Sequence, residues 1–179
     1  LPKSSVSIWS SSKKFSVVEC ILKNGREIVY MQGKIVSVDG FKAVGMTYFG
    51  DNNNGEIPKM WQIFNQKFME ISNMSKPVLF YGICDSDMDA QGRFHYAAAV
   101  GVDSFENVPE TMVTKTIPAG NYLVYTYEGD IKNLGEFYGK IFETYLPQSG
   151  HEMDMRPQLE VYDDRFMKTG AFDIYIPVK

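Results

Sequence analysis

The sequence of 179 residues predicts an α+β fold in which one strand–helix–strand–strand unit occurs twice. A five-residue motif, Thr-Tyr-x-Gly-Asp, appears at residues 47–51 and again at residues 126–130. Each copy ends a β-rich run and precedes a segment whose apolar residues recur at helical spacing. Two short β-rich segments then close each half. We therefore expect duplicated units forming a pseudo-twofold curved antiparallel sheet, with two helices that flank a groove.

The two helices are predicted from one-sided apolar stripes. The first is expected from about Pro58, because proline is favoured in a first helical turn, and its apolar residues recur every three or four positions up to residue 71. The second is expected from Asn133, a predicted N-cap with Glu136 three residues later. Trp61 in the first stripe and Tyr138 in the second occupy matching positions, so the helices are related by the repeat.

Two strands are predicted after each helix, from β-rich segments bounded by turn residues. The four strands are Pro77–Cys84 and Phe94–Val102 in the first half, and Pro157–Tyr162 and Phe172–Val178 in the second. The segments predicted to join them as turns are Asp85–Gly92 and Asp163–Gly170. These elements place the duplicated domain at residues 31–179, with repeats at about 31–109 and 110–179.

Residues 1–30 lie outside the repeat and are predicted to form a linker and extra strands. Asn-Gly between apolar runs at Lys23–Arg26 indicates a hairpin, and the Ser- and Lys-rich residues 1–14 indicate a loosely held linker. The chain begins with Leu1 rather than Met. We therefore expect either a fragment of a longer protein or a processed chain.

Composition excludes several classes of function. A net charge of -4 disfavours direct binding to a nucleic-acid backbone. The sequence has no apolar run of about 18 residues, and Cys20 and Cys84 lack a metal-type spacing, so a cytoplasmic, reduced protein without a membrane partner is expected. His95 and His151 are the only histidines and belong to no zinc-type cluster. No metal, no cofactor and no conventional catalytic motif is predicted.

The excess of aromatic residues, 14% of the chain, indicates a candidate ligand site. Two helices side by side over a sheet leave a seam, and such seams are common ligand sites. The aromatic residues expected to reach the seam are Trp61, Phe137 and Tyr138 from the helices, and Tyr48, Tyr96, Tyr125 and Tyr175 from the sheet. The alternative is that the aromatic stripes are ordinary core, which is the commoner role of such stripes. Both interpretations remain open at the level of sequence.

Glu160 is the charged residue that stands out in the second half. Strand alternation places it on one face with Gln158 and Tyr162, and taken alone this pattern favours a solvated face. The first half has Gly82 or Ile83 at the corresponding place, so the carboxylate breaks the repeat. If Glu160 were buried against aromatic rings, a cationic ligand would compensate its charge.

Five segments carry a family resemblance: Phe41–Gly45 and Ile57–Trp61 in the first half, and Ile117–Tyr122, Leu159–Asp163 and Asp173–Val178 in the second. Together they resemble the GyrI-like domain, also called the AraC-type effector-binding domain. The resemblance covers about residues 31–179 and implies a duplicated fold whose inter-helix groove binds small molecules, often aromatic and cationic drugs. It also implies that the acid of the Glu-x-Tyr segment, Glu160 here, faces the pocket.

The resemblance implies two classes of function. The first is the carboxy-terminal effector-binding domain of a bacterial AraC-type transcription regulator, which would contact DNA only through a helix-turn-helix upstream of Leu1. The alternative is a stand-alone protein that sequesters drugs, or a hydrolase of strained electrophilic natural products in which Glu160 and Tyr125 or Tyr175 assist attack by water. A homodimer is compatible with either.

Overall fold

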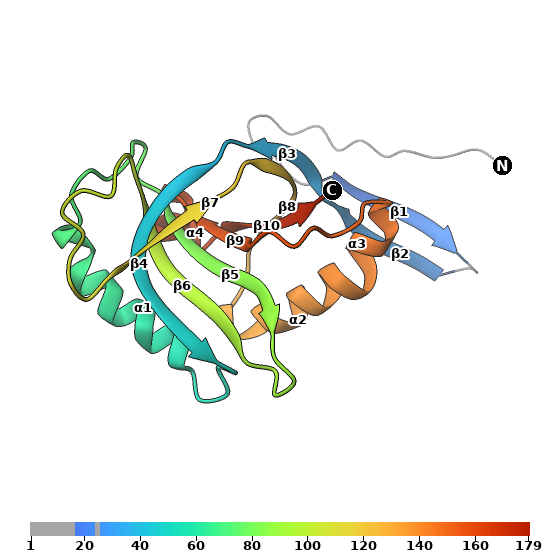
Figure 1. The fold of residues 1–179 in the computed structure, drawn as a ribbon. Coiled ribbons are helices and arrows are strands. Elements are labelled where there is room, and N and C mark those ends of the chain that lie inside the picture. Colours follow the sequence, from blue (N-terminus) through green and yellow to red (C-terminus); the bar gives the residue numbers. More distant parts are fainter. Residues whose placement is uncertain (1–16, 24–25) are drawn as a thin grey trace.

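The computed structural model describes the backbone of residues 17–23 and 26–179, with side chains described from residue 31 onward. Its main element is an eight-stranded antiparallel sheet with α1 (Glu56–Lys67) and α2 (Leu134–Lys140) packed on one face (Figure 1). The strands are β3 (Lys34–Val38), β4 (Phe41–Gly50), β5 (Phe80–Met88), β6 (Phe94–Val102), β7 (Val113–Ile117), β8 (Gly120–Tyr127), β9 (Gln158–Tyr162) and β10 (Phe172–Val178). The predicted α+β class is confirmed.

The order of the strands shows the duplication directly. It reads β3-β8-β10-β9-β5-β6-β4-β7, so each unit contributes three strands in the same relative order and the two units meet where β5 pairs with β9. At that junction Gly82 lies opposite Glu160. The outer strands are exchanged, because β3 pairs with β8 of the second unit and β7 with β4 of the first. The predicted pseudo-twofold sheet is confirmed, and this exchange joins its two halves.

The repeated Thr-Tyr-x-Gly-Asp motif has a steric explanation. In each copy the tyrosine side chain folds back over the glycine two residues later. A Cβ on Gly50 would lie 2.1 Å from the hydroxyl oxygen of Tyr48, and a Cβ on Gly129 would lie 2.9 Å from that of Tyr127. The hydroxyl of Tyr48 then accepts the Asn52 N–H, while that of Tyr127 donates to the Asp130 carbonyl. The motif therefore anchors the loop that leads into each helix.

The helix of the second half is less regular than the helix that the apolar stripe predicts. It consists of a 3₁₀ turn at Ile131–Asn133, then α2, a π-helical turn at Ile141–Tyr145 and α3 (Leu146–Ser149). Asn133 was the predicted N-cap, but its side chain makes no capping hydrogen bond. The cap is Asp130 instead, whose carboxylate accepts the Lys132 N–H.

Both segments predicted as turns contain regular structure. β5 continues to Met88, so the first turn is only Asp89–Gly92, where the Asp89 carboxylate accepts the N–H groups of Gln91 and Arg93. Most of Asp163–Gly170 forms α4 (Asp164–Thr169). Asp163 caps this helix by accepting the Arg165 N–H, and Gly170 ends it at a positive φ of 76°. These polar residues favour helix ends as well as turns, which is why the turn prediction was wrong.

The predicted hairpin before the repeat is formed by β1 (Val17–Lys23) and β2 (Arg26–Gln32), paired antiparallel. Its two turn residues, the predicted linker at residues 1–14 and the side chain of Cys20 lie outside the described part of the chain. Within the described residues, no helix is both long and apolar enough to cross a membrane.

The two faces of the sheet carry different apolar clusters. On the helix face one cluster lies under α1, around Phe64, and a second lies under α2 and the π-helical turn, around Ile141. The opposite face carries a third cluster that includes Ile83, Tyr122 and Leu159. Glu160 is on the helix face of the central strand β9, between the first two clusters.

Candidate functional site

Glu160 is the only charged residue that is buried among residues 31–179, with 8% of its surface exposed. The strand alternation alone favoured a solvated face, and the structure overturns that interpretation because helices cover this face of β9. No ion pair within the described residues includes Glu160. A buried carboxylate without a cation is costly unless hydrogen bonds compensate for the lost water.

Three tyrosine hydroxyls provide that compensation. Tyr96 donates to Oε2 of Glu160 at 2.6 Å, Tyr162 donates to the same oxygen at 2.9 Å, and Tyr138 donates to Oε1 at 3.1 Å. They come from β6, β9 and α2, so three elements converge on one carboxylate. A carboxylate offers about four acceptor positions, and three are used here.

Aromatic rings orient these hydroxyls. The indole N–H of Trp61, on α1, donates to the hydroxyl oxygen of Tyr96 at 3.0 Å. The ring of Tyr162 meets Trp61 edge to face at a centroid distance of 5.3 Å and stacks on Phe172 at 4.6 Å. Trp61 thereby directs the Tyr96 proton toward Glu160, and the rings enclose the carboxylate on the helix side.

Gly82 makes room for this arrangement. A Cβ at this position would lie 2.2 Å from the hydroxyl oxygen of Tyr96 and 2.3 Å from Oε2 of Glu160. Gly82 lies opposite Glu160 in the β5–β9 pair. The difference between the two repeats therefore has a steric role. Gly82 of the first half leaves a space, and the carboxylate of Glu160 from the second half occupies it.

The environment keeps the phenols protonated. Burial, followed by the charge of Glu160, raises the pKa of Tyr96, of Tyr138 and of Tyr162 well above the ordinary value of 10. The same two causes raise the pKa of the neighbouring Cys84 thiol to about 12. The site is thus one anion held by neutral hydrogen-bond donors, beside a thiol that remains protonated.

We expect the free energy of unfolding to fall as the pH rises above about 10. The unfolded chain then releases phenolic protons that the folded chain retains, so each of these tyrosines costs up to about 1.4 kcal/mol per pH unit until its folded pKa is reached. Urea denaturation between about pH 8 and pH 11 measures this slope, which Tyr162→Phe should reduce. Ionisation of every tyrosine near pH 10 in a protein that stays folded would contradict the prediction.

The structure brings only some of the predicted site residues together. Tyr96 and Tyr138 contact Glu160 directly, and Trp61 reaches it through Tyr96. Tyr48 pairs with Tyr96 across β4 and β6, but its hydroxyl accepts the Asn52 N–H instead.

The other three predicted residues lie away from the carboxylate. Phe137 packs on Tyr127 at a centroid distance of 5.0 Å. Tyr125 is two strands from Glu160, fully buried and stacked on Tyr145 at 5.9 Å. Tyr175 follows Ile174, which shares the face of Glu160, and therefore lies on the opposite face of the sheet.

Tyr162 contacts Glu160 although it is not among the ligand residues predicted from the sequence. The signal was present, since Tyr162 stands two residues from Glu160 on the same face of a predicted strand. The sequence indicates Gly82 or Ile83 only as the place where the repeat lacks a carboxylate, and no sequence signal identifies Gly82 as the position that leaves space for the carboxylate.

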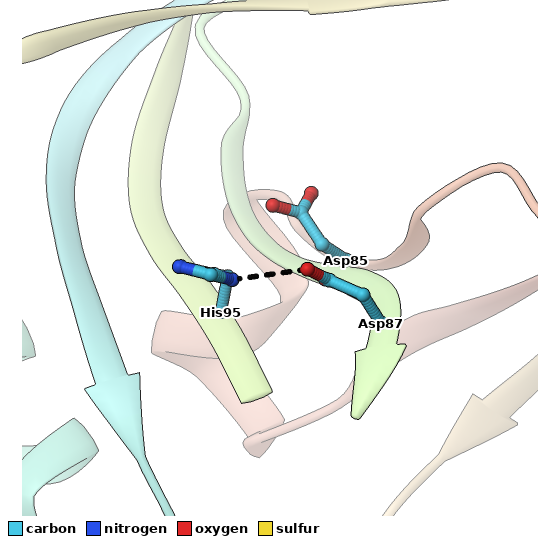
Figure 2. A group of neighbouring side chains, drawn as sticks. All are labelled: Asp85, Asp87 and His95. Carbon is cyan, nitrogen blue, oxygen red and sulfur yellow. Dashed lines mark hydrogen bonds and ion pairs between the residues drawn. The ribbon is translucent and has the colours of Figure 1, made fainter. Parts of the chain in front are cut away.

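A second group of titratable side chains lies at the ends of β5 and β6. Ligand atoms of Asp85, Asp87 and His95 are within 4.8 Å of one another (Figure 2). Each carboxylate already has a cationic or hydrogen-bonding partner: Asp85 pairs with Lys115 at 2.5 Å, and Asp87 contacts Nδ1 of His95 at 3.3 Å. Asp87 and His95 are exposed, so we assign this group to the polar surface.

Comparisons with known proteins agree with this fold. The family model of the integron-associated effector-binding protein Cass2 matches residues 34–178. The transcriptional regulator BrlR of Pseudomonas aeruginosa is 34% identical over 152 residues, which are 83% of this chain and 56% of BrlR. The chain thus spans about half the length of that relative.

Two solved structures are similar at low sequence identity and show the fold alone. The integron cassette protein Cass2 of Vibrio cholerae has a TM-score of 0.61 at 18% identity, covering 84% of this chain and 98% of that one. SAV2435 bound to tetraphenylphosphonium has a TM-score of 0.66 at 18% identity, covering 83% and 94%. The family match spans nearly the whole duplicated sheet and confirms the resemblance to GyrI-like domains. The chain belongs to the Cass2 family of integron-associated effector-binding proteins.

Proposed function

We propose that this domain binds small organic cations with aromatic or other apolar groups, with Glu160 as the counter-charge. The observation that carries the proposal is a buried carboxylate that forms no ion pair with the described residues and is enclosed by Trp61, Tyr96, Tyr138 and Tyr162. A cationic ligand gains both the attraction of the carboxylate and cation–π contacts with the rings. In this low-dielectric setting both contributions exceed their values in water.

The geometry indicates which hydroxyl the ligand replaces. Tyr96 is buried, whereas Tyr138 is partly exposed and makes the longest of the three hydrogen bonds, 3.1 Å. Tyr138 belongs to α2, a seven-residue helix without a buried residue. We expect a ligand to enter beside Tyr138 and to take its place on Oε1 of Glu160.

Similar proteins support this class of ligand and a regulatory context. SAV2435 was solved with tetraphenylphosphonium, an aromatic cation, and BrlR is a transcriptional regulator. We propose that this chain is the effector-binding part of a transcription regulator, with DNA contacted by a different part of the protein. A helix-turn-helix encoded upstream of Leu1 would support this assignment, and a gene that starts at this domain would favour a sequestering protein.

Binding is favoured over hydrolysis by the state of the tyrosines. A general acid works best when its pKa lies near the working pH. The pKa of each phenol at Glu160 is raised well above 10, so proton donation to a substrate is unfavourable near neutrality. Tyr125 and Tyr175, the predicted partners for a hydrolase, lie away from Glu160.

Replacing Glu160 by Gln tests the proposed function. The variant keeps the shape and an acceptor for the tyrosines but removes the charge, so affinity for tetraphenylphosphonium should fall about 30-fold, or roughly 2 kcal/mol. Isothermal titration calorimetry measures the change. Glu143→Gln is the control, because Glu143 is an exposed acid beyond α2 and its loss changes the net charge equally. Equal affinity of Glu160→Gln and the wild type would remove Glu160 from the site.

A further inference from the structure

A cavity lies on the face of the sheet opposite Glu160. It has a volume of about 330 Å³ and sits where the connection from β3 to β4 passes over β5, β9 and β10. Leu159 and Val161 of β9 form part of its wall, and strand alternation directs these side chains away from the face that Glu160 occupies. The sheet therefore separates the two sites. Their ligands would not compete for space.

The wall of this cavity is aromatic. Phe41 and Tyr81 contact each other at a centroid distance of 4.6 Å with an interplanar angle of 31°, and Tyr175 completes the aromatic lining. Within residues 31–179, no hydrogen bond of the Tyr81 or Tyr175 hydroxyl to a protein acceptor is formed. Burial and the nearby Tyr175 raise the pKa of Tyr81 to about 12, so its hydroxyl remains a neutral donor.

The rim of the cavity carries one acid. Asp39 is exposed on the β3–β4 turn and belongs to no ion pair within the described residues. It is the only charged residue of the lining, which is otherwise apolar or hydroxyl-bearing. An anionic rim over aromatic walls complements a molecule with a flat ring at one end and a positive charge at the other.

We propose that this cavity is a second ligand site, which takes a flat two-ring aromatic ammonium. The ring lies against Phe41, Tyr81 and Tyr175, and the ammonium group extends to Asp39. A volume near the lower end of ligand pockets suits two fused rings, and we expect the four-ring cation tetraphenylphosphonium to be too bulky for it. The proposal does not depend on ligand binding at Glu160.

Tryptamine is the probe, titrated calorimetrically into the domain with and without saturating tetraphenylphosphonium. We expect tryptamine to bind in both conditions and to bind Glu160→Gln as it binds the wild type. Val161→Trp, which fills the cavity, should abolish binding. Val113→Trp is its matched control, because Val113 is exposed on the edge strand β7 and lies outside the cavity.

Asp39→Asn provides a second variant on an exposed turn, where folding is not at risk. It should weaken the binding of tryptamine about fivefold, as expected for an exposed ion pair, and leave the binding of uncharged 3-methylindole unchanged.

The proposal is overturned if tryptamine does not bind at millimolar concentration, or if Val161→Trp and Asp39→Asn both leave its affinity intact. It is also overturned if Glu160→Gln or saturating tetraphenylphosphonium removes tryptamine binding, because the probe then occupies the first site. If Glu160→Gln leaves the affinity for tetraphenylphosphonium unchanged while the tryptamine results are as expected, only the proposed function at Glu160 is rejected.

Discussion

Gly82→Ala should lower the free energy of unfolding by about 3 kcal/mol and weaken tetraphenylphosphonium binding about 100-fold. The added Cβ would lie 2.2 Å from the Tyr96 hydroxyl oxygen and 2.3 Å from Oε2 of Glu160. Tyr96 and Glu160 are both buried, so neither polar atom can move into solvent without losing its partner. The substitution therefore separates the carboxylate from a donor and costs more than ordinary overpacking.

The matched control is Gly101→Ala, another glycine-to-alanine change in the central part of the sheet. Its Cβ would lie 3.3 Å from Cε2 of Tyr81, a side chain with room to adjust. We expect it to change the free energy of unfolding by less than about 1 kcal/mol and to leave tetraphenylphosphonium binding unaltered. Urea denaturation and calorimetry measure both quantities. Equal effects of the two substitutions would show that Gly82 is not a space reserved for the carboxylate.

Phe64→Ala should destabilise the domain by about 4 kcal/mol. Phe64 lies on α1, is 0% exposed, and packs against Trp61 at a centroid distance of 5.7 Å and against Phe80 at 6.3 Å. Its removal leaves a cavity between the helix and the sheet. Because Trp61 loses a packing partner, its hydrogen bond to Tyr96 should also loosen, and the affinity at Glu160 should fall in the protein that remains folded.

Ile63→Ala is the control on the same helix. Ile63 is 46% exposed, so truncation should cost no more than about 1 kcal/mol and leave ligand affinity unchanged. Urea denaturation at neutral pH measures the change in the free energy of unfolding for both variants. A cost for Phe64→Ala close to that of Ile63→Ala would mean that α1 is not anchored by this ring and that Trp61 is positioned by other contacts.

The duplicated scaffold was predictable because its signals are local. The Thr-Tyr-x-Gly-Asp motif and the helical stripes each occur twice in the same order, and the structure confirms the pseudo-twofold sheet that they predict. The exchange of β3 and β7 between the units was not predictable, since no short-range pattern specifies which edge a strand will join. The π-helical turn at Ile141–Tyr145 likewise depends on packing against the sheet.

The site was predictable only in part because it depends on register between strands. Glu160 and Tyr162 share a face by simple alternation within β9. The position of Tyr175 depends instead on how β10 pairs with β9, where Ile174 lies opposite Glu160. Because α4 lies between β9 and β10, the sequence does not indicate how the two strands pair. Tyr175 was therefore predicted to reach the seam, although the pairing directs it to the opposite face of the sheet.

The buried charge of Glu160 is proposed to make the site selective for cations. Two probes of the same shape and opposite charge test it most directly: the tetraphenylphosphonium cation and the tetraphenylborate anion, titrated into the same preparation. We expect the cation to bind at least about 100-fold more tightly than the anion, and Glu160→Gln to reduce that ratio by about 30-fold. Equal affinity of the wild type for both probes would contradict the claim and leave the aromatic rings alone as the source of binding.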